Sequence, residues 1–159
     1  LGRSSGKPTL VGKEIISLFE SAIGSVMSIT LNRSGGKLVV IGGLYIDAKL
    51  WVNLAASDSP PDLSSPRIFL SIYVGGGLVA RSSYPRTGAS TQYPGFEVLF
   101  NGYFQLPHAV ISPSSGAEDV VVKVGFGASD NLNTVSLRSD INEYIKISAR
   151  SMTVMELKK

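Results

Sequence analysis

The chain has 159 residues, the size of one ordinary domain, and is long enough to bury a core without disulfide support. It contains no cysteine, so a disulfide framework, a cysteine-ligated zinc site and a thiol nucleophile are excluded. The net charge of +3 comes from scattered Lys and Arg, and no apolar run approaches the ~20 residues of a membrane span, so we expect neither a nucleic-acid partner nor membrane insertion. Leu1 does not begin a signal-like segment, and we expect the chain to be a domain excised from a longer protein.

The first predicted element is an amphipathic helix over Val11–Ile23. Apolar residues recur in it at spacings of three and four, which is the pattern of a helix with one buried face. We therefore expect residues 1–24 to form a linker with a short helix, and residues 25–159 to form the main domain. The helix is either the end of a stalk or a helix that packs on its own domain.

Every later element is predicted to be a strand, because the apolar residues alternate with a period of two between clusters of Gly, Pro, Ser, Asn and Asp. Gly75-Gly76-Gly77 is a turn signal between two of these strands. Two long irregular connections are expected at 55–66 and 81–94. The predicted strands are Val26–Leu31, Lys37–Ile41, Leu44–Leu54, Ile68–Val74, a strand from Leu78, Phe96–Leu106, Val120–Phe126 and Tyr144–Leu157.

Three of these strands carry large apolar side chains on both faces. In Phe96–Leu106, five apolar residues line one face, while Leu99 and Tyr103 stand on the other with polar neighbours. Tyr45 and Trp51 are likewise on the second face of their strand. In the last strand, alternation assigns Ile145, Ile147 and Ala149 to one face and Tyr144, Met152 and Val154 to the other. A face too apolar for water and too polar for a core is typical of a subunit interface. The alternative is that these are ordinary half-exposed side chains.

Several local patterns resemble the C1q and tumour necrosis factor superfamily of trimeric jelly rolls. Gly43-Leu44-Tyr45 is similar to the Gly-x-Tyr of the family's third strand, and FNGYFQL at Phe100–Leu106 is similar to its sixth. IFLSIYVGGGLVAR at Ile68–Arg81 resembles the strand, Gly turn and strand between them. Gly116-Ala117-Glu118-Asp119 precedes the seventh strand, after an inserted PHAVISPSS that departs from the family pattern.

The resemblance implies a two-sheet antiparallel jelly-roll sandwich that assembles as a homotrimer. In such trimers the inner sheet faces the threefold axis, which would place Tyr45, Trp51, Leu99, Tyr103, Tyr144, Met152 and Val154 at the interface. The absence of cysteine and the leading helix look more like the receptor-binding heads of phage tail fibres and virion spikes than like secreted cytokines. The implied function is attachment to a host glycan or protein receptor at the virion surface. The alternatives are a trimerisation or carbohydrate-binding module of a polysaccharide-degrading spike, and a secreted extracellular ligand.

The predicted loop RSSYPRTGASTQY is the candidate receptor-binding surface. Its Tyr and Arg residues can stack on sugar rings or anchor a protein contact. The alternative is a surface loop that is polar because it is exposed. The candidate residues are Arg81, Tyr84, Arg86, Gln92 and Tyr93.

No catalytic constellation is found in the sequence. His108 is the only histidine and follows a proline, so a solvated loop residue is expected rather than a zinc ligand. Glu118 and Asp119 would point to opposite sides of a strand, and Asp58 and Asp62 are either turn formers or calcium ligands. We expect a protein that is not an enzyme and that has no cofactor.

Overall fold

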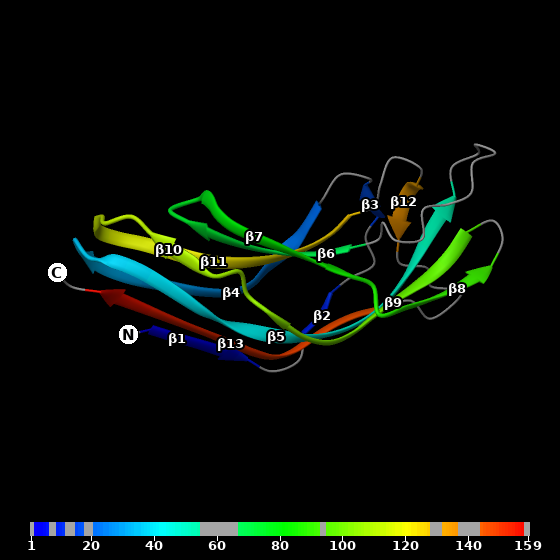
Figure 1. The fold of residues 1–159 in the computed structure, drawn as a ribbon, viewed down its shortest axis with the longest axis horizontal. Coiled ribbons are helices and arrows are strands. Elements are labelled where there is room, and N and C mark those ends of the chain that lie inside the picture. Colours follow the sequence, from blue (N-terminus) through cyan, green and yellow to red (C-terminus); the bar gives the residue numbers. More distant parts are fainter. Residues whose placement is uncertain are drawn as a thin grey trace.

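The structure is a computed structural model. It describes residues 2–6, 9–11, 15–17, 21–54, 67–92, 95–127, 132–136 and 144–157, with the side chains of 25–50, 67–88, 97–126 and 145–157. These residues form strands joined by turns and short connections, and they include no helix. The fold is all-β with two antiparallel sheets, as the alternation predicts (Figure 1).

The larger sheet, called sheet A here, has nine strands, and the long strand β5 is at its centre. β5 pairs with β13 on one side and with β9 on the other. β1 and β2 add to the outer edge of β13, β8 adds to β9, and β3 adds to β12. The strands of sheet A are β1 (Gly2–Gly6), β2 (Thr9–Val11), β3 (Ile15–Ser17), β5 (Lys37–Leu54), β8 (Gly88–Gln92), β9 (Gly95–Gln105), β10 (Ala109–Ile111), β12 (Leu132–Ser136) and β13 (Tyr144–Leu157).

The smaller sheet, called sheet B, has the order β4-β11-β6-β7. Its strands are β4 (Ser21–Ser34), β11 (Ser115–Gly127), β6 (Arg67–Val74) and β7 (Gly77–Pro85). The predicted turn between β6 and β7 is confirmed. Gly75 and Gly76 have φ values of 57° and 84°, and two consecutive left-handed residues are what a tight hairpin of this type requires.

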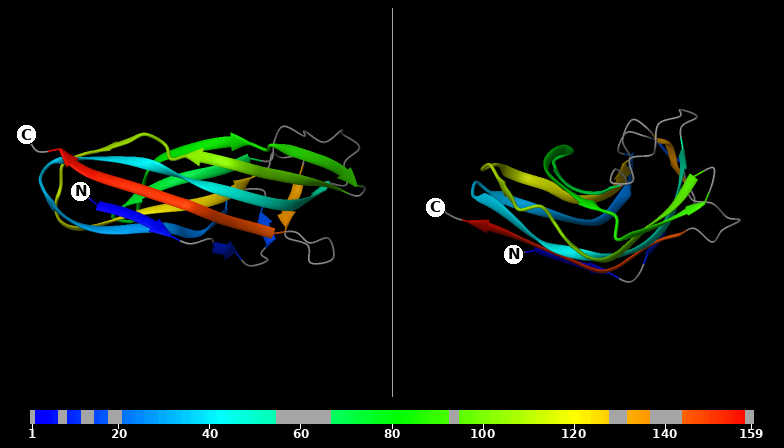
Figure 2. Two further views of the ribbon diagram at one scale, coloured as in Figure 1. Left: turned by 90° about the horizontal axis from the view of Figure 1, so that it is seen from below. Right: turned by 45° about the vertical axis from the view of Figure 1, so that its right-hand side comes forward.

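The core lies between the two sheets, which are both curved and stack over much of their length (Figure 2). Alternation sends every second residue of each strand into this space, so Ile46 and Leu50 of β5 and Val122 of β11 are fully buried. Two edge-to-face aromatic pairs join the sheets. Phe100 of β9 and Phe126 of β11 have ring centroids 5.4 Å apart, and Tyr84 of β7 and Phe104 of β9 have centroids 5.2 Å apart.

The helix predicted over Val11–Ile23 is not found at the residues that the structure describes. Ile15–Ser17 is strand β3, and β4 begins at Ser21. Residues 12–14 and 18–20 lie outside the described residues. The apolar residues here can satisfy a strand as well as a helix, and pairing of β3 with β12 decides between them. Since β1 and β2 pair with β13, the boundary predicted at residue 24 does not coincide with a break in the strand pairing.

The last strand contains a β-bulge that corrects the predicted faces. Ser148 pairs with Tyr45 and Ser151 pairs with Gly43, so two residues of β13 oppose Leu44 alone. One of them, Ala149, has a φ of 45°. The extra residue reverses the alternation beyond it. Met152 and Val154, predicted to face outward, are therefore buried at 1% exposure on the same side as Ile145 and Ile147.

Candidate functional site

The outer face of sheet A, which points away from sheet B, carries a band of exposed apolar side chains. Val39 of β5 is directly opposite Val110 of β10 and Met155 of β13, so apolar residues adjoin across three strands. The most exposed members are Val110 at 57%, Tyr103 at 54%, Leu157 at 51% and Ile41 at 46%. Side chains that continue from strand to strand form a surface patch of the kind that marks a protein interface. We call Val39, Ile41, Tyr45, Leu99, Tyr103, Val110, Met155 and Leu157 the sheet A patch.

Polar links in the middle of the sheet A patch orient its tyrosines. Tyr45 and Tyr103 are directly paired across β5 and β9. The Tyr45 hydroxyl donates to Oδ1 of Asn101 at 2.7 Å, and Nδ2 of Asn101 donates to Asp47 at 3.3 Å. The Tyr103 hydroxyl is 3.3 Å from the hydroxyl of Ser151 on β13. Both rings are therefore held along the sheet, and their apolar surface is left toward solvent.

The predicted interface residues divide into three groups. Tyr45, Leu99 and Tyr103 lie on the outer face of sheet A. Tyr45 is half-buried there, whereas Leu99 is 37% exposed and Tyr103 is 54% exposed. Met152 and Val154 lie in the core for the reason given above. The side chains of Trp51 and Tyr144 lie outside the described residues, although both backbones belong to sheet A.

Sequence reasoning missed the end of the patch around Val39 and Ile41. The segment Leu38–Ile41 is apolar at every position, so it offers no polar face to show which residues turn outward. Val110 was missed because its segment was predicted to be an irregular insertion, whereas it forms β10 and pairs with β5. The unbroken apolar run was itself the available signal, since such a run needs partners on both faces.

The predicted receptor-binding loop is largely strand. β7 continues to Pro85 and β8 starts at Gly88, so only Arg86 and Thr87 connect them. Tyr84 turns inward, packs edge-on against Phe104 and donates its hydroxyl to the Gln105 carbonyl at 2.7 Å. Tyr84 therefore joins the two sheets, and its assignment as a receptor contact stays a prediction.

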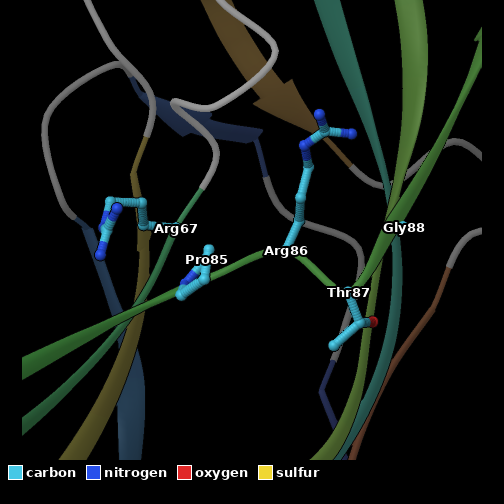
Figure 3. Close-up of a pocket in the computed structure, with 5 residues that line it drawn as sticks. All are labelled: Arg67, Pro85, Arg86, Thr87 and Gly88. Carbon is cyan, nitrogen blue, oxygen red and sulfur yellow. The ribbon is translucent and has the colours of Figure 1, made fainter.

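The other predicted receptor-binding residues are dispersed. Arg81 lies on the outer face of sheet B, and Arg86 borders a hollow of about 420 Å³ lined by Arg67, Pro85, Thr87 and Gly88 (Figure 3). The guanidinium of Arg86 extends away from that of Arg67 in this view, so the two do not converge on one point. The side chain of Gln92 and all of Tyr93 lie outside the described residues.

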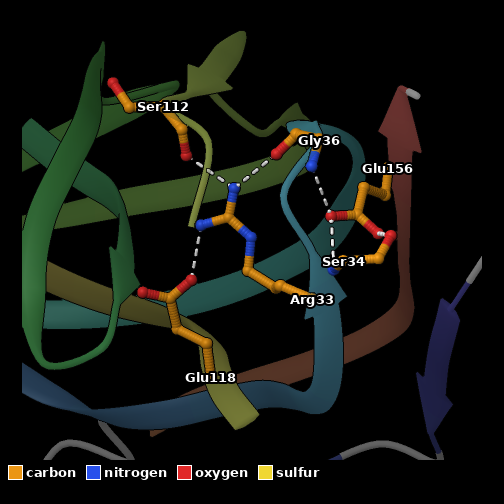
Figure 4. Close-up of polar contacts among 6 residues, drawn as sticks. All are labelled: Arg33, Ser34, Gly36, Ser112, Glu118 and Glu156. Carbon is orange, nitrogen blue, oxygen red and sulfur yellow. Dashed lines mark hydrogen bonds and ion pairs between the residues drawn. The ribbon is translucent and has the colours of Figure 1, made fainter. Parts of the chain in front are cut away.

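A buried arginine closes one end of the sandwich (Figure 4). The Arg33 side chain is 1% exposed and pairs with Glu118 at 2.6 Å. It also donates to the carbonyl oxygens of Gly36 and Ser112. The ion pair joins β4 to β11, and the carbonyl contacts tie in the β4–β5 turn and the segment before β11. The arrangement is a structural clamp in which both terminal nitrogens of Arg33 donate, while its Nε is buried without a hydrogen-bond partner among the described residues.

Glu156 of β13 holds the same β4–β5 turn from the other sheet. Its carboxylate accepts hydrogen bonds from the hydroxyl and the N–H of Ser34 and from the N–H of Gly36 (Figure 4). The pKa of Glu156 is lowered, most strongly by the hydrogen bond from the Ser34 hydroxyl. The N–H bonds and the charge of Arg33 also lower the pKa, and burial opposes them without cancelling their sum. The carboxylate stays ionised and stabilises the turn.

The candidate acid–base and metal residues do not assemble into a site. Glu118 faces Arg33 inside the sandwich, whereas Asp119 accepts from the Thr30 hydroxyl at 2.6 Å outside it. The two carboxylates thus diverge across β11. His108 is exposed beside a hollow of about 230 Å³. Among the described residues, no three His, Cys, Asp or Glu side chains could hold a metal ion, and Asp58 and Asp62 lie outside those residues.

No helix in the described ranges is long and apolar enough to cross a membrane. No protein-family model matches the chain, and no curated protein sequence matches it either.

A search of solved structures aligns the chain with an acetyl xylan esterase (Est2A) from the rumen bacterium Butyrivibrio proteoclasticus. The identity is 12% and the TM-score is 0.25, and the alignment covers 98% of this chain but only 35% of the esterase. The aligned protein is an enzyme, so the prediction that this chain is not one is withdrawn, without the reverse being established. At this TM-score the likeness carries no argument about the fold or the activity of this chain.

Proposed function

We propose that the chain is a jelly-roll head domain that assembles as a homotrimer through the outer face of sheet A and mediates attachment of a viral or phage fibre or spike to a host surface. The sheet A patch is the observation that carries this proposal. An apolar band that runs across three strands is costly in water and is expected to be covered by a partner.

The strand pairing supports the jelly-roll part of the proposal. Among the eight principal strands, the first pairs with the last (β1 with β13), and the pairs then nest inward as β4 with β11, β5 with β9 and β6 with β7. A hairpin ribbon wound into two sheets gives this nesting, which is the double Greek key of a jelly roll. The additional pairs β13 with β5 and β11 with β6 close the two sheets.

Assembly explains how a head whose individual binding sites are weak could attach to a surface. Three weak sites on one axis bind a repetitive surface with an avidity about 100-fold above that of one site. The absence of cysteine favours a fibre or spike over a secreted ligand. The chain would then act at the virion surface.

The mass of the protein in solution tests the assembly. Light scattering at micromolar concentration should give about three times 16.8 kDa. Tyr103→Arg should dissociate the trimer, because it places a charge in a desolvated interface. Leu78→Arg is the matched control, since Leu78 is similarly exposed at 48% but lies on β7 in sheet B. A folded wild-type monomer would contradict the proposal.

Binding to immobilised cell-surface glycans and proteins tests the attachment. The trimer should be retained, and the Tyr103→Arg monomer should bind about 100-fold more weakly through loss of avidity. A trimer retained by none of these surfaces would exclude attachment as its function.

A further inference from the structure

The outer face of sheet B has a different chemical character from the sheet A patch. Along β6, the residues that alternate with the buried Ile68, Leu70, Ile72 and Val74 point outward. β11 and β7 flank β6 on either side (Figure 1). The outward residues on these strands include two aromatic rings and three cations: Phe69, Tyr73, Arg67, Arg81 and Lys123.

The cations and rings on this face are in direct contact. Lys123 and Arg81 are the two residues opposite Ser71, on either side of β6. Nζ of Lys123 lies 4.3 Å from the ring centroid of Tyr73, and Cζ of Arg81 lies 6.0 Å from that of Phe69. Nε of Arg81 donates to the Ser71 hydroxyl at 3.0 Å. These contacts fix the positions of the two charges and reduce the conformational entropy lost when a ligand binds.

Among the described residues of this face, cations outnumber carboxylates. In the described part of sheet B, the carboxylates are those of Glu118 and Asp119. Glu118 points inward to Arg33, which leaves Asp119 as the one outward carboxylate, at the end of the face remote from Arg67. The described residues of this face therefore contribute a net positive charge, which attracts and orients polyanions.

The positive surface continues into the hollow beside β7. Arg67 anchors to Ser83 on the outer face through Nε at 3.1 Å and also lines the hollow that Arg86 borders (Figure 3). Four cations thus follow one path from Lys123 to Arg86.

The spacing of these cations indicates an extended ligand. Lys123 and Arg81 are separated by two strand spacings, about 10 Å, and Arg67 is about 13 Å along the strand from Ser71. One phosphate or sulfate ion cannot reach all of them, whereas a chain with repeated anionic groups can. Single-stranded nucleic acid is less favoured because its bases need open aromatic faces for stacking, and Phe69 and Tyr73 each have a cation over the ring.

We propose that the outer face of sheet B, from Lys123 to the hollow beside Arg86, binds an anionic polysaccharide through its carboxylate or sulfate groups. This inference rests on the proposed function, because the anionic polysaccharide is the class of host-surface ligand that the attachment head would bind. It is compatible with assembly, because packing of sheet A between subunits leaves the opposite face of the sandwich outward.

Affinity for defined polymers tests the inference. The probes are heparin as a sulfated chain, polygalacturonate as a carboxylated chain, dextran as a neutral chain and oligo(dT) as a nucleic acid. We expect heparin and polygalacturonate to bind, dextran not to bind, and affinity to fall as salt concentration rises. Failure of both anionic polysaccharides to bind, or tighter binding of oligo(dT), would overturn the inference.

Charge-matched variants locate the binding. The double variant R81Q/K123Q should bind heparin at least tenfold more weakly, because two charged contacts to the polymer are lost. The double variant K37Q/K146Q removes the same charge from exposed positions on sheet A and should bind within about twofold of wild type. Arg86→Gln, which touches neither ring, should weaken binding about threefold. An equal loss in both double variants would show that only net charge matters and would overturn the inference.

Sedimentation of the same samples separates this inference from the proposed assembly. A trimer that binds no anionic polysaccharide overturns the ligand class alone. A monomer that binds heparin through Arg81 and Lys123 supports the ligand class and contradicts the trimeric head.

Discussion

The ring of Tyr103 lies over Gly43, so that a Cβ at position 43 would meet the ring atoms at 2.6 Å. The ring crosses from β9 over β5 and brings its hydroxyl to within 3.3 Å of Ser151 on β13. This aromatic cover on a strand glycine accounts for Gly43 physically and holds Tyr103 flat within the sheet A patch.

The two adjacent glycines of β5 should respond differently to alanine. Gly43→Ala should lower the free energy of unfolding by about 1 kcal/mol or less, because the colliding atoms are the far end of the exposed Tyr103 side chain, which can rotate aside at the loss of its contact with Ser151. Gly42→Ala should cost more than about 2 kcal/mol, because its Cβ would overlap the backbone carbonyl of Ser151 and its φ is 154°. Denaturant unfolding measures both changes, and equal costs would contradict the assigned contacts.

Alternation accurately identified the buried face of the strands that run without interruption. Leu44, Ile46, Ala48 and Leu50 of β5 are all buried, as are the described inward residues of β9. Lys37–Ile41 and Leu44–Leu54 were expected to be separate strands, yet they form one strand through Gly42 and Gly43, because β13 pairs along both parts. Partner strands thus decide the length of an element where local glycines indicate a break.

The bulge in β13 limits what alternation can predict. Ile147 and Met152 are five residues apart, an odd separation that assigns them to opposite faces of a regular strand. The intervening segment SARS, which has no large apolar residue, was the available hint. Ala149 adopts a positive φ without being a glycine, however, and no local propensity predicts that. Of the residues predicted to lie on the outward face, Tyr45, Leu99 and Tyr103 lie there, whereas Met152 and Val154 lie in the core.

A pair of methionines on β13 tests the bulge. Met152→Ala should lower the free energy of unfolding by about 2–5 kcal/mol, because it opens a cavity in the core. Met155→Ala is the control on the outward face and should cost about 1 kcal/mol or less. Both should be measured by denaturant unfolding at one protein concentration, since the proposed assembly would make stability depend on concentration. A larger cost for Met155→Ala than for Met152→Ala would contradict the bulge and would indicate a strand with regular alternation.

Removal of the Glu118 carboxylate should expose the cost of the buried Arg33 charge. Glu118→Ala should destabilise the fold by about 2–3 kcal/mol, because the guanidinium keeps its two carbonyl acceptors but loses its counterion. Asp119→Ala removes the same charge one residue away and should change the free energy of unfolding by less than about 1 kcal/mol, since Asp119 is exposed. Guanidinium unfolding distinguishes the variants, and a Glu118→Ala protein as stable as wild type would show that the ion pair adds nothing.

The lowered pKa of Glu156 predicts a pH-dependent contribution to stability. A carboxyl whose pKa is lower in the folded state stabilises that state above its unfolded pKa, and the effect is lost as the pH falls through its folded pKa. The difference in unfolding free energy between wild type and Glu156→Gln should therefore be constant near neutral pH and should shrink below about pH 4. Urea unfolding of both proteins at pH 7 and pH 3 measures this difference. Glu97→Gln is the control for a general charge effect, because it removes a carboxylate that pairs with Lys49 at 3.2 Å and does not contact the β4–β5 turn. A difference between wild type and Glu156→Gln that persists unchanged at pH 3 would mean that the bonds to Ser34 and Gly36 do not require the ionised carboxylate.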